Sequence, residues 1–314
     1  MSRDPRFSVV VPAHDAESTI GDAIRSVLAQ TCDDFELIVV DDGSSDETAS
    51  IVRDFAAADA RIRLVSQPNK GPAAARNTAI ELARGELVSM LDGDDLWLPR
   101  YLERMGEVLD RERSAAFAYT DAWVLGSDGA HVRTTTAMAH WRPPSRPPRE
   151  PHRFLALLLE RSNFIYTSVT VRREALVKCA GFDERLWHGE DFELWVRLLE
   201  ARQAAVFAGE VLAIHRERPG SLTSDPRRLY EGICKVYRLI LDEHELSGEL
   251  RAVASSRATW WERQVELLDR PSGAERLRRL ARRLKGRLLA RRQRLRVLPA
   301  DVEQTLTACL PPRD

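Results

Sequence analysis

Short apolar runs alternate with segments of helical periodicity over the first hundred residues of the chain. Runs rich in apolar and β-branched residues, a pattern typical of strands buried on both faces, occupy 7–11, 35–40, 62–65 and 87–91. Helical spacing of apolar residues fills the intervals at 16–29, 47–58 and 73–83. Strands separated by single helices predict right-handed crossovers, and therefore a Rossmann-like α/β fold with a mostly parallel sheet and helices on both faces.

Local signals give the ends of two of these helices. Ser44 and Glu47 have the spacing of a capping box for the helix that reaches Ala58, and Gly85 is suited to end the helix over 73–83. Further along, the pattern predicts helices at 101–111, 154–160 and 191–201, strands at 115–125 and 167–172, and an exposed Pro- and Arg-rich loop at 142–151. An α/β domain over 1–224 and a helical C-terminal extension over 225–314 follow from this pattern.

Composition describes a globular protein with a substantial core. The 314 residues are 44% hydrophobic and 30% charged, and the formal net charge is −1, so the chain as a whole favours neither nucleic acid nor membrane. Its four cysteines are widely spaced, which argues against a disulfide framework or a zinc site. Because no apolar run reaches the ~20 residues of a membrane span, we expect a cytoplasmic protein.

The segment 273–298 departs from this average. It holds ten arginines and one lysine against a single acid, Glu275, and its leucines recur at roughly helical intervals. This pattern predicts a basic amphipathic helix, which either docks on an anionic membrane surface as a peripheral anchor or packs its leucine stripe on the rest of the protein. Nucleic acid is not an expected partner, since no aromatic series accompanies the arginines.

Polar clusters follow three of the predicted strands, at 12–15, 41–43 and 92–95. In parallel α/β sheets the carboxyl ends of strands line the ligand crevice, so these clusters are expected to converge. Asp92 and Asp94 offer the carboxylate oxygens that Mg²⁺ or Mn²⁺ prefers, and such an ion would neutralise charge on a diphosphate leaving group. A plain turn is the alternative interpretation of this Asp-rich segment.

The ordered series of motifs resembles the family 2 glycosyltransferases, which have the GT-A fold. It comprises FSVVVPAHDAE at 7–17, FELIVVDDGSSD at 35–46, NKG at 69–71, ARN at 75–77 and LDGDDLW at 91–97, and the resemblance extends to about Leu222. It implies an inverting, metal-dependent enzyme of cell-surface polysaccharide biosynthesis. Such an enzyme moves a sugar from a nucleotide diphosphate, most often UDP, to a hydroxyl of a glycan or lipid-linked acceptor. Residues 1–100 would form the donor half and 101–224 the acceptor half.

The resemblance also implies roles for individual residues in the donor half. Asp41 would accept a hydrogen bond from the uracil ring, with Asp42 capping the following turn. Asp92 would lie near the ribose and the metal, and Asp94 would bind the metal directly. The remaining donor-binding positions are Pro12, Ala13, His14, Glu17, Lys70 and Arg76. Many family members have an aromatic residue and an asparagine in place of His14 and Asp15, so stacking on the base would be less extensive here.

In the acceptor half, Asp191 matches the general base of the family, with Glu190 as its rival. Both acids also suit the first turn of a helix, where the dipole favours negative charge. Trp187 and Trp195 could form an acceptor wall, although the helical spacing of Trp195 favours the core. In the late loop, His215 would be a third metal ligand, and Arg216 or Arg218 would grip phosphate oxygens.

Two other functions fit parts of the sequence. A sugar-phosphate nucleotidylyltransferase would need a Gly-rich phosphate loop after the first strand, where this chain has Pro-Ala-His-Asp at 12–15. A non-catalytic protein that binds nucleotide sugars would not need both the Asp-x-Asp motif and the pair Glu190 and Asp191. The transferase is therefore the favoured hypothesis.

Overall fold

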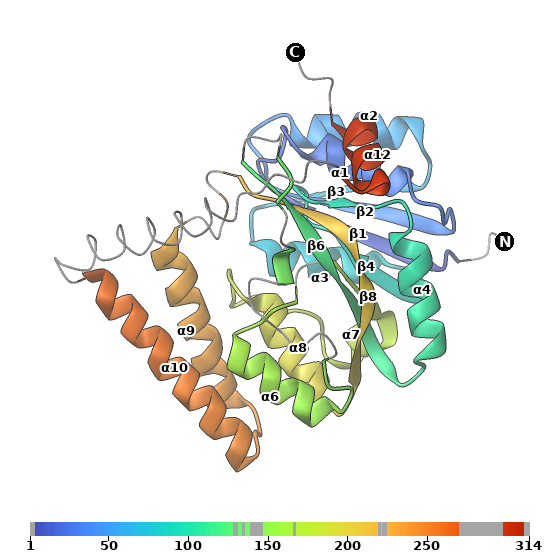
Figure 1. The fold of residues 1–314 in the computed structure, drawn as a ribbon. Helices are drawn as coiled ribbons and strands as arrows, with labels where there is room; N and C mark the ends of the chain where they lie inside the picture. Colours follow the sequence, from blue (N-terminus) through green and yellow to red (C-terminus); the bar gives the residue numbers. More distant parts are fainter. Residues whose placement is uncertain are drawn as a thin grey trace.

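One mixed sheet of eight strands organises the protein (Figure 1). The computed structural model describes residues 4–127, 131–133, 136–138, 147–165, 168–218, 221, 225–269 and 298–310. The strand order is β3-β2-β1-β4-β7-β6-β8-β5. The strands are β1 (Phe7–Ala13), β2 (Phe35–Asp42), β3 (Ile62–Gln67), β4 (Leu87–Met90), β5 (Leu96–Trp97), β6 (Ala115–Leu125), β7 (Val169–Arg172) and β8 (Ala204–Arg216).

The four strands predicted in the first hundred residues form the parallel half of the sheet. β3, β2, β1 and β4 are parallel neighbours, and β6 pairs in parallel with β8. β7 is antiparallel to both β4 and β6, and the short β5 is antiparallel to β8. The prediction of a mostly parallel sheet is therefore confirmed, with antiparallel pairs confined to the second half and its edge.

Helices cover both faces of the sheet, as predicted. Val9, Val11 and Leu37 pack against α1 (Ile20–Leu28), α2 (Thr48–Ala58) and α4 (Tyr101–Arg111). Val10 and Ile38 point to the opposite face, since successive side chains of a strand alternate. The helices on that face are α3 (Pro72–Leu82), α6 (Pro151–Arg161), α7 (Arg173–Lys178) and α8 (Glu190–Glu200). Two hydrophobic cores thus sandwich the central strands.

Several local predictions need correction. Helix α2 has Glu47 at its N-cap, and the N–H of Thr48 is bonded by Asp46, so the capping box of Ser44 and Glu47 does not form. The Ser44 hydroxyl instead accepts from the N–H of Asp15 in the loop after β1. The long strand β8 was not predicted, because Gly209 and Glu210 interrupt its apolar pattern. As a result His215 and Arg216 end a strand rather than lie in a loop.

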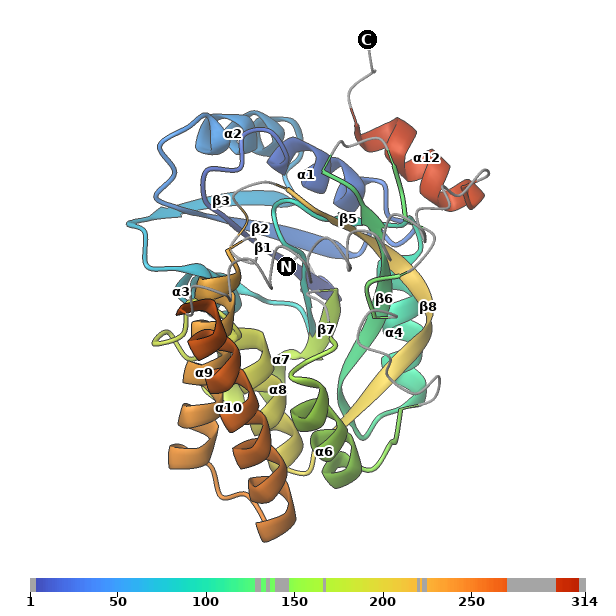
Figure 2. The same ribbon diagram turned by 60° about the vertical axis from the view of Figure 1, so that its left-hand side comes forward.

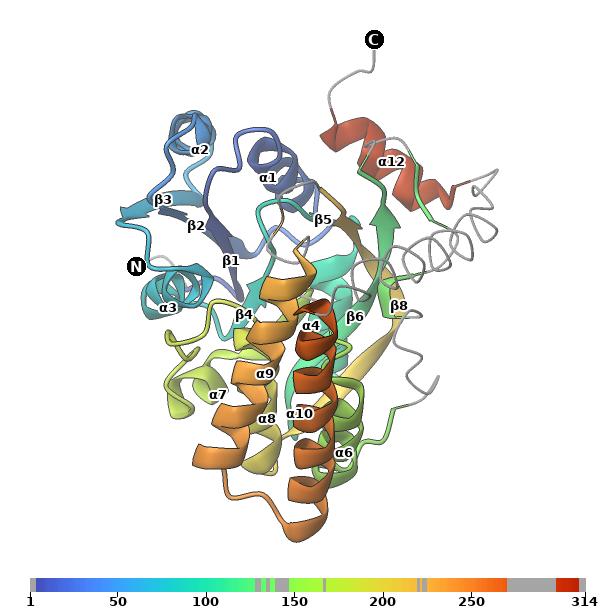
Figure 3. The same ribbon diagram turned by 90° about the vertical axis from the view of Figure 1, so that its left-hand side faces the viewer.

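The C-terminal helices pack at two separate places (Figures 2 and 3). Helices α9 (Pro226–Glu243) and α10 (Gly248–Asp269) lie side by side against α8 and α6. Helix α12 (Ala300–Cys309) lies against α1 instead, where the carbonyl of Cys309 accepts from Arg25. The basic segment 273–298 therefore connects two anchored helices, and apart from Leu298 it lies outside the described residues. Within the described part, no helix is both long and apolar enough to cross a membrane.

Candidate active site at the strand ends

The ends of β1, β2 and β4 meet, as the sequence predicted. Ala13, the last residue of β1, is paired with Asp41 near the end of β2. On the other side of Ala13 lies the turn after β4: a Cβ built on Gly93 would stand 3.2 Å from the carbonyl oxygen of Pro12 and 3.8 Å from Cβ of Ala13. The first-strand loop therefore lies between Asp41 and the Asp-rich turn.

Three acids of this turn converge. Asp92, Asp94 and Asp95 each offer one carboxylate oxygen, and these oxygens lie within 4.8 Å of one another. Burial, followed by repulsion from Asp95 and Asp92, raises the pKa of Asp94 to about 6. Carboxylate oxygens at this spacing are the ligand set that Mg²⁺ and Mn²⁺ prefer, so the residues fit a divalent cation. Asp95, buried in the protein, adds to the pair expected from the Asp-x-Asp motif.

A cationic side chain accompanies each acid of this cluster. Asp92 accepts from Nη2 of Arg76 at 2.7 Å, and Asp94 accepts from Nε of Arg218 at 2.6 Å. Asp95 lies 3.1 Å from Nδ1 of His215 and also accepts from the backbone N–H of Arg216 at 2.9 Å. The structure thus brings Arg76, Arg218 and His215 to the acids; their expected roles toward the nucleotide, the phosphates and the metal stay predictions.

His215 lies beside the cluster. Burial alone would lower the pKa of its ring, but the neighbouring carboxylate of Asp95 outweighs this effect and raises the pKa to about 9. A histidine binds a metal only as the neutral imidazole. In this arrangement His215 contacts Asp95, and its role as a metal ligand stays a prediction.

Arg76 links the acid cluster to the acceptor side. Its buried guanidinium donates from Nη1 to Glu190 at 2.5 Å and from Nη2 to Asp92 at 2.7 Å, and it lies over the ring of Phe182. Each of these acids comes from a different part of the chain. The arginine therefore connects the turn after β4 to the start of α8 through two ion pairs.

Asp191 follows Glu190 in the first turn of α8. Its Oδ2 accepts from the side-chain amide of Asn163 at 2.9 Å, and its Oδ1 accepts from the N–H of Phe192 at 2.7 Å. Burial, followed by repulsion from Glu190, raises the pKa of Asp191 to about 7. Asn163 has a left-handed backbone, with φ of 70°, and no sequence signal pointed to it. A carboxyl group with this pKa can exchange a proton near neutral pH.

The two acids at the end of β2 have different contacts from those expected. Asp41 is the residue that caps the following turn, since its Oδ1 accepts from the N–H of Ser44 at 3.1 Å. Asp42, which was expected to be the cap, instead accepts from the N–H groups of Lys70 and Gly71 at 2.9 and 2.8 Å, and from Gln67. Asp42 therefore fixes the loop before α3. Asp41 remains the candidate for binding the base.

The other predicted donor residues differ in their exposure and in their partners. His14 is exposed and is bonded by the amide of Asn69. Glu17 accepts from the N–H of Glu47, and the side chain of Lys70 is exposed. Arg216, by contrast, has its guanidinium on the buried carboxylate of Asp22 in α1, 2.8 Å away. This partner makes Arg218 the better candidate for a phosphate contact.

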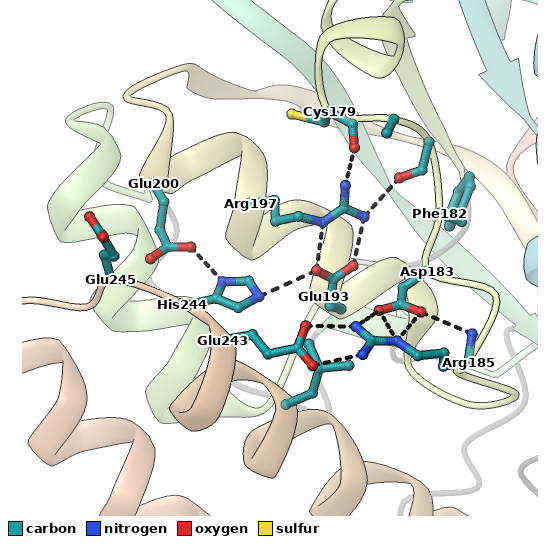
Figure 4. A pocket seen from close by; sticks show the side chains of 13 residues that line it. Cys179, Phe182, Asp183, Arg185, Glu193, Arg197, Glu200, Glu243, His244 and Glu245 are labelled. Carbon is teal, nitrogen blue, oxygen red and sulfur yellow. Dashed lines mark hydrogen bonds and ion pairs between the residues drawn. The ribbon is translucent and has the colours of Figure 1, made fainter.

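A separate hollow lies beside the C-terminal half of α8 (Figure 4). Its volume is about 590 Å³, and most of the charged groups that line it are paired with one another. Arg197 donates to Glu193 at 2.5 Å and 2.7 Å, and His244 contacts Glu193 and Glu200. These pairs tie α8 to the end of α9. The hollow does not include the acid cluster, and its chemistry is that of a structural junction.

Comparisons with known proteins agree with this geometry. Residues 8–179 match the profile of the family described as "Glycosyl transferase family 2". The chain is 30% identical over 242 residues to the "Uncharacterized glycosyltransferase EpsJ" of Bacillus subtilis (strain 168), which covers 76% of the chain and 66% of EpsJ. It is 29% identical over 224 residues, 71% of the chain and 81% of the relative, to the Escherichia coli "UDP-Glc:alpha-D-GlcNAc-diphosphoundecaprenol beta-1,3-glucosyltransferase WfgD".

A solved structure has the same fold. The mannosyltransferase PcManGT from Pyrobaculum calidifontis, in complex with GDP-Man and Mn²⁺, superposes with a TM-score of 0.59 over 98% of this chain and 86% of its own, at 17% identity. The fold and the strand-end acids define a GT-A glycosyltransferase. The chain belongs to glycosyltransferase family 2. It spans only part of several curated relatives, including 66% of the length of EpsJ.

Proposed function

We propose that this glycosyltransferase moves a sugar from a UDP-type nucleotide diphosphate donor to a hydroxyl group of a glycan or lipid-linked acceptor, with inversion at the anomeric carbon. The observation that carries the proposal is the position of Arg76, which joins the acid cluster at Asp92 to the pair Glu190 and Asp191. A donor diphosphate held by the cluster would therefore lie next to the candidate base.

The donor would occupy the edge formed by the ends of β1, β2 and β4. Asp41 suits the imide N–H of uracil, because a carboxylate accepts strongly from such a donor. Pro12, Ala13 and His14 would border the nucleotide, with Glu17 and Lys70 at the exposed rim. The names of relatives support the donor class: WfgD uses UDP-Glc, while PcManGT was solved with GDP-Man.

Asp94 and Asp92 would hold a Mg²⁺ or Mn²⁺ ion, with Asp95 beside them. When bound, the ion supplies charge neutralisation for the departing diphosphate. Arg218, paired with Asp94 in this structure, would exchange that carboxylate for phosphate oxygens when the donor binds. The Mn²⁺ in the structure of PcManGT supports a divalent cation in this fold.

Asp191 would act as the general base. It takes the proton of the acceptor hydroxyl while that oxygen bonds to the anomeric carbon. The bond from this carbon to the diphosphate breaks, and its electron pair leaves with the nucleotide. Glu190 is less suited, because its Oε1 is already bonded to the guanidinium of Arg76. A single displacement of this kind inverts the anomeric centre.

The acceptor and the location follow from chemistry rather than from the described geometry. A lipid-linked acceptor requires the enzyme to work at a membrane surface, and the basic segment 273–298 would supply attraction to anionic lipid there. The name of WfgD, whose acceptor is a diphosphoundecaprenol lipid, supports this class. We therefore place the enzyme in the cytoplasm, peripherally at the inner face of the membrane.

Release of UDP from a panel of UDP-sugars with Mn²⁺ tests the proposal. Acceptor-dependent release should disappear in Asp94→Asn and Asp191→Asn and persist in the control Asp110→Asn, which alters an exposed acid paired with Arg6. Asp42→Ala is unsuitable as a control, because Asp42 fixes the loop before α3. Tight UDP-sugar binding without turnover for any donor and acceptor would favour a non-catalytic binding protein instead.

A further inference from the structure

Trp187 is an exposed aromatic side chain beside the candidate active site. Among the described residues, the large hydrophobic side chains that stay strongly exposed are Val177, Trp187 (49%) and Trp260 (44%). Trp187 lies in the segment that leads into α8, three residues before Glu190. Single exposed apolar side chains are common on protein surfaces, so the exposure of Trp187 gains meaning only from its position.

One face of the indole of Trp187 is already covered. A Cβ built on Gly71 would lie 3.2 Å from Cε2 and 3.3 Å from Cδ2, the two atoms that the rings share, and 3.5 Å from Cζ2. Contact with the shared bond means that Gly71 lies under the ring face rather than at its edge. Gly71 has φ of 92° and its N–H is held by Asp42. The indole thus rests on the fixed loop before α3, while 49% of the residue stays exposed.

The segment that carries Trp187 is held from two sides. On one side, the side chain of Asn77 in α3 accepts from the N–H of Phe182 and donates to its carbonyl. On the other side, Arg185 is bonded to Glu243 of α9 by two hydrogen bonds of 2.7 Å, and Lys235 of α9 donates to the carbonyl of Arg185. A ring whose backbone is fixed in this way loses little conformational entropy when a ligand covers it.

We propose that the open face of Trp187 binds a pyranose ring of the acceptor glycan. A pyranose has an apolar face of C–H groups and a polar edge of hydroxyl groups, and a flat aromatic surface complements that face while leaving the hydroxyl groups free to reach Asp191. Trp187 contacts the loop at Gly71 and directly precedes α8, the helix that carries Asp191, so a sugar on its ring would lie between the proposed donor and acceptor residues. This inference rests on the proposed transferase function.

Binding of methyl glycosides and disaccharides of glucose, galactose, mannose and N-acetylglucosamine, measured by saturation-transfer NMR on the full chain, tests the proposal. Saturation of the sugar C–H protons should be strong in the wild type and in the control Trp260→Ala. It should be lost in Trp187→Ala and partly kept in Trp187→Phe. With a glycoside that accepts sugar, Trp187→Ala should raise the acceptor KM about tenfold, and the Kd for UDP with Mn²⁺ should not change.

Other outcomes separate the two proposals. If Trp187→Ala binds glycosides as well as the wild type does, or loses UDP binding instead, the proposed role of Trp187 in sugar binding is wrong. If the wild type binds UDP with Mn²⁺ but no glycoside, the proposed role of Trp187 is also wrong, while the proposed donor site is supported. If glycoside binding depends on Trp187 but the protein binds no nucleotide sugar, the role of Trp187 in sugar binding stands and the proposed transferase function is wrong. Equal unfolding midpoints of Trp187→Ala and Trp260→Ala exclude a merely structural effect.

Discussion

Asp92 and Glu190 are bonded to the same guanidinium, that of Arg76, although 98 residues separate them in the chain. The first closes the donor side of the candidate site and the second opens the helix that carries the base. One buried side chain therefore connects the acid cluster to the first residue of α8. This relationship makes Arg76 a positioning residue for both halves of the proposed reaction.

Substitution of Arg76 should cost stability as well as activity. Arg76→Ala leaves Asp92 and Glu190 without their shared cation, and removing one partner of a buried ion pair typically lowers the free energy of unfolding by about 3–5 kcal/mol. Arg76→Lys keeps the charge but cannot bridge both acids, so we expect partial stability with UDP release still strongly reduced. Urea unfolding and UDP release measure the two effects.

Arg100→Ala is the matched control for Arg76. Arg100 also pairs with an acid, Glu103 at 3.0 Å, but both side chains are exposed, so the loss should change the free energy of unfolding far less than the loss of Arg76. If Arg76→Ala were no more destabilising than Arg100→Ala, the ion pairs of Arg76 with Asp92 and Glu190 would not contribute to stability in solution.

The pH dependence of transfer should report Asp191. Its pKa is raised to about 7, and only the carboxylate can take a proton, so acceptor-dependent kcat/KM should fall about tenfold per pH unit below pH 7 and level off above it. Asp191→Asn should lower the rate by about 10²–10⁴. A rate that stays flat from pH 5 to pH 8 at saturating Mn²⁺ would argue against this base.

The same group should make the protein less stable as pH rises. Between about pH 4 and pH 7 the folded protein keeps a proton on Asp191 that the unfolded chain has released, so the free energy of unfolding decreases across this window. Asp191→Asn removes the buried charge and should therefore increase the unfolding free energy at pH 8. Chemical denaturation of both proteins at pH 5 and pH 8 measures this difference; a variant that is destabilised at pH 8 would contradict it.

Much of the fold could be predicted from periodicity. The predicted helix over 101–111 and strand over 115–125 agree with α4 and β6 to the residue, because α4 keeps a helical spacing of buried residues and β6 is buried almost throughout. Strand β8 was not predicted, because Gly209 and Glu210 interrupt its run of apolar residues. The capping box failed because Ser44 bonds to a loop 29 residues away, a contact that local sequence cannot reveal.

The candidate site was predictable only where it depends on strand ends. The convergence of Pro12, Asp41 and Asp92 follows from parallel topology, whereas the pairing of Arg76 with Glu190 depends on how α8 docks on α3. The partner of Asp191, Asn163, and the partner of Arg216, Asp22, come from elements whose sequence carries no functional signal. Such residues are found only when the chain is folded.

Gly189 should be intolerant of a side chain. It precedes α8 with φ of 72°, and a Cβ there would lie 2.8 Å from Cγ2 of Val236 in α9. Gly189→Ala should therefore destabilise the protein by about 1–3 kcal/mol and displace Asp191. Gly248→Ala is the control, since a Cβ at Gly248 meets no atom within 4 Å. Equal unfolding midpoints for the two variants would show that α9 does not restrain the base.

Calorimetric titration of UDP, with and without Mn²⁺, shows whether the strand-end acids hold a cation that makes a nucleotide diphosphate bind there. We expect tight binding that requires Mn²⁺, is lost in Asp94→Asn and is retained in Asp110→Asn, with a matching rise of about 2.7 kcal/mol in wild-type stability at a hundred times Kd. UDP binding that is equally strong without the metal, or unchanged in Asp94→Asn, would contradict it.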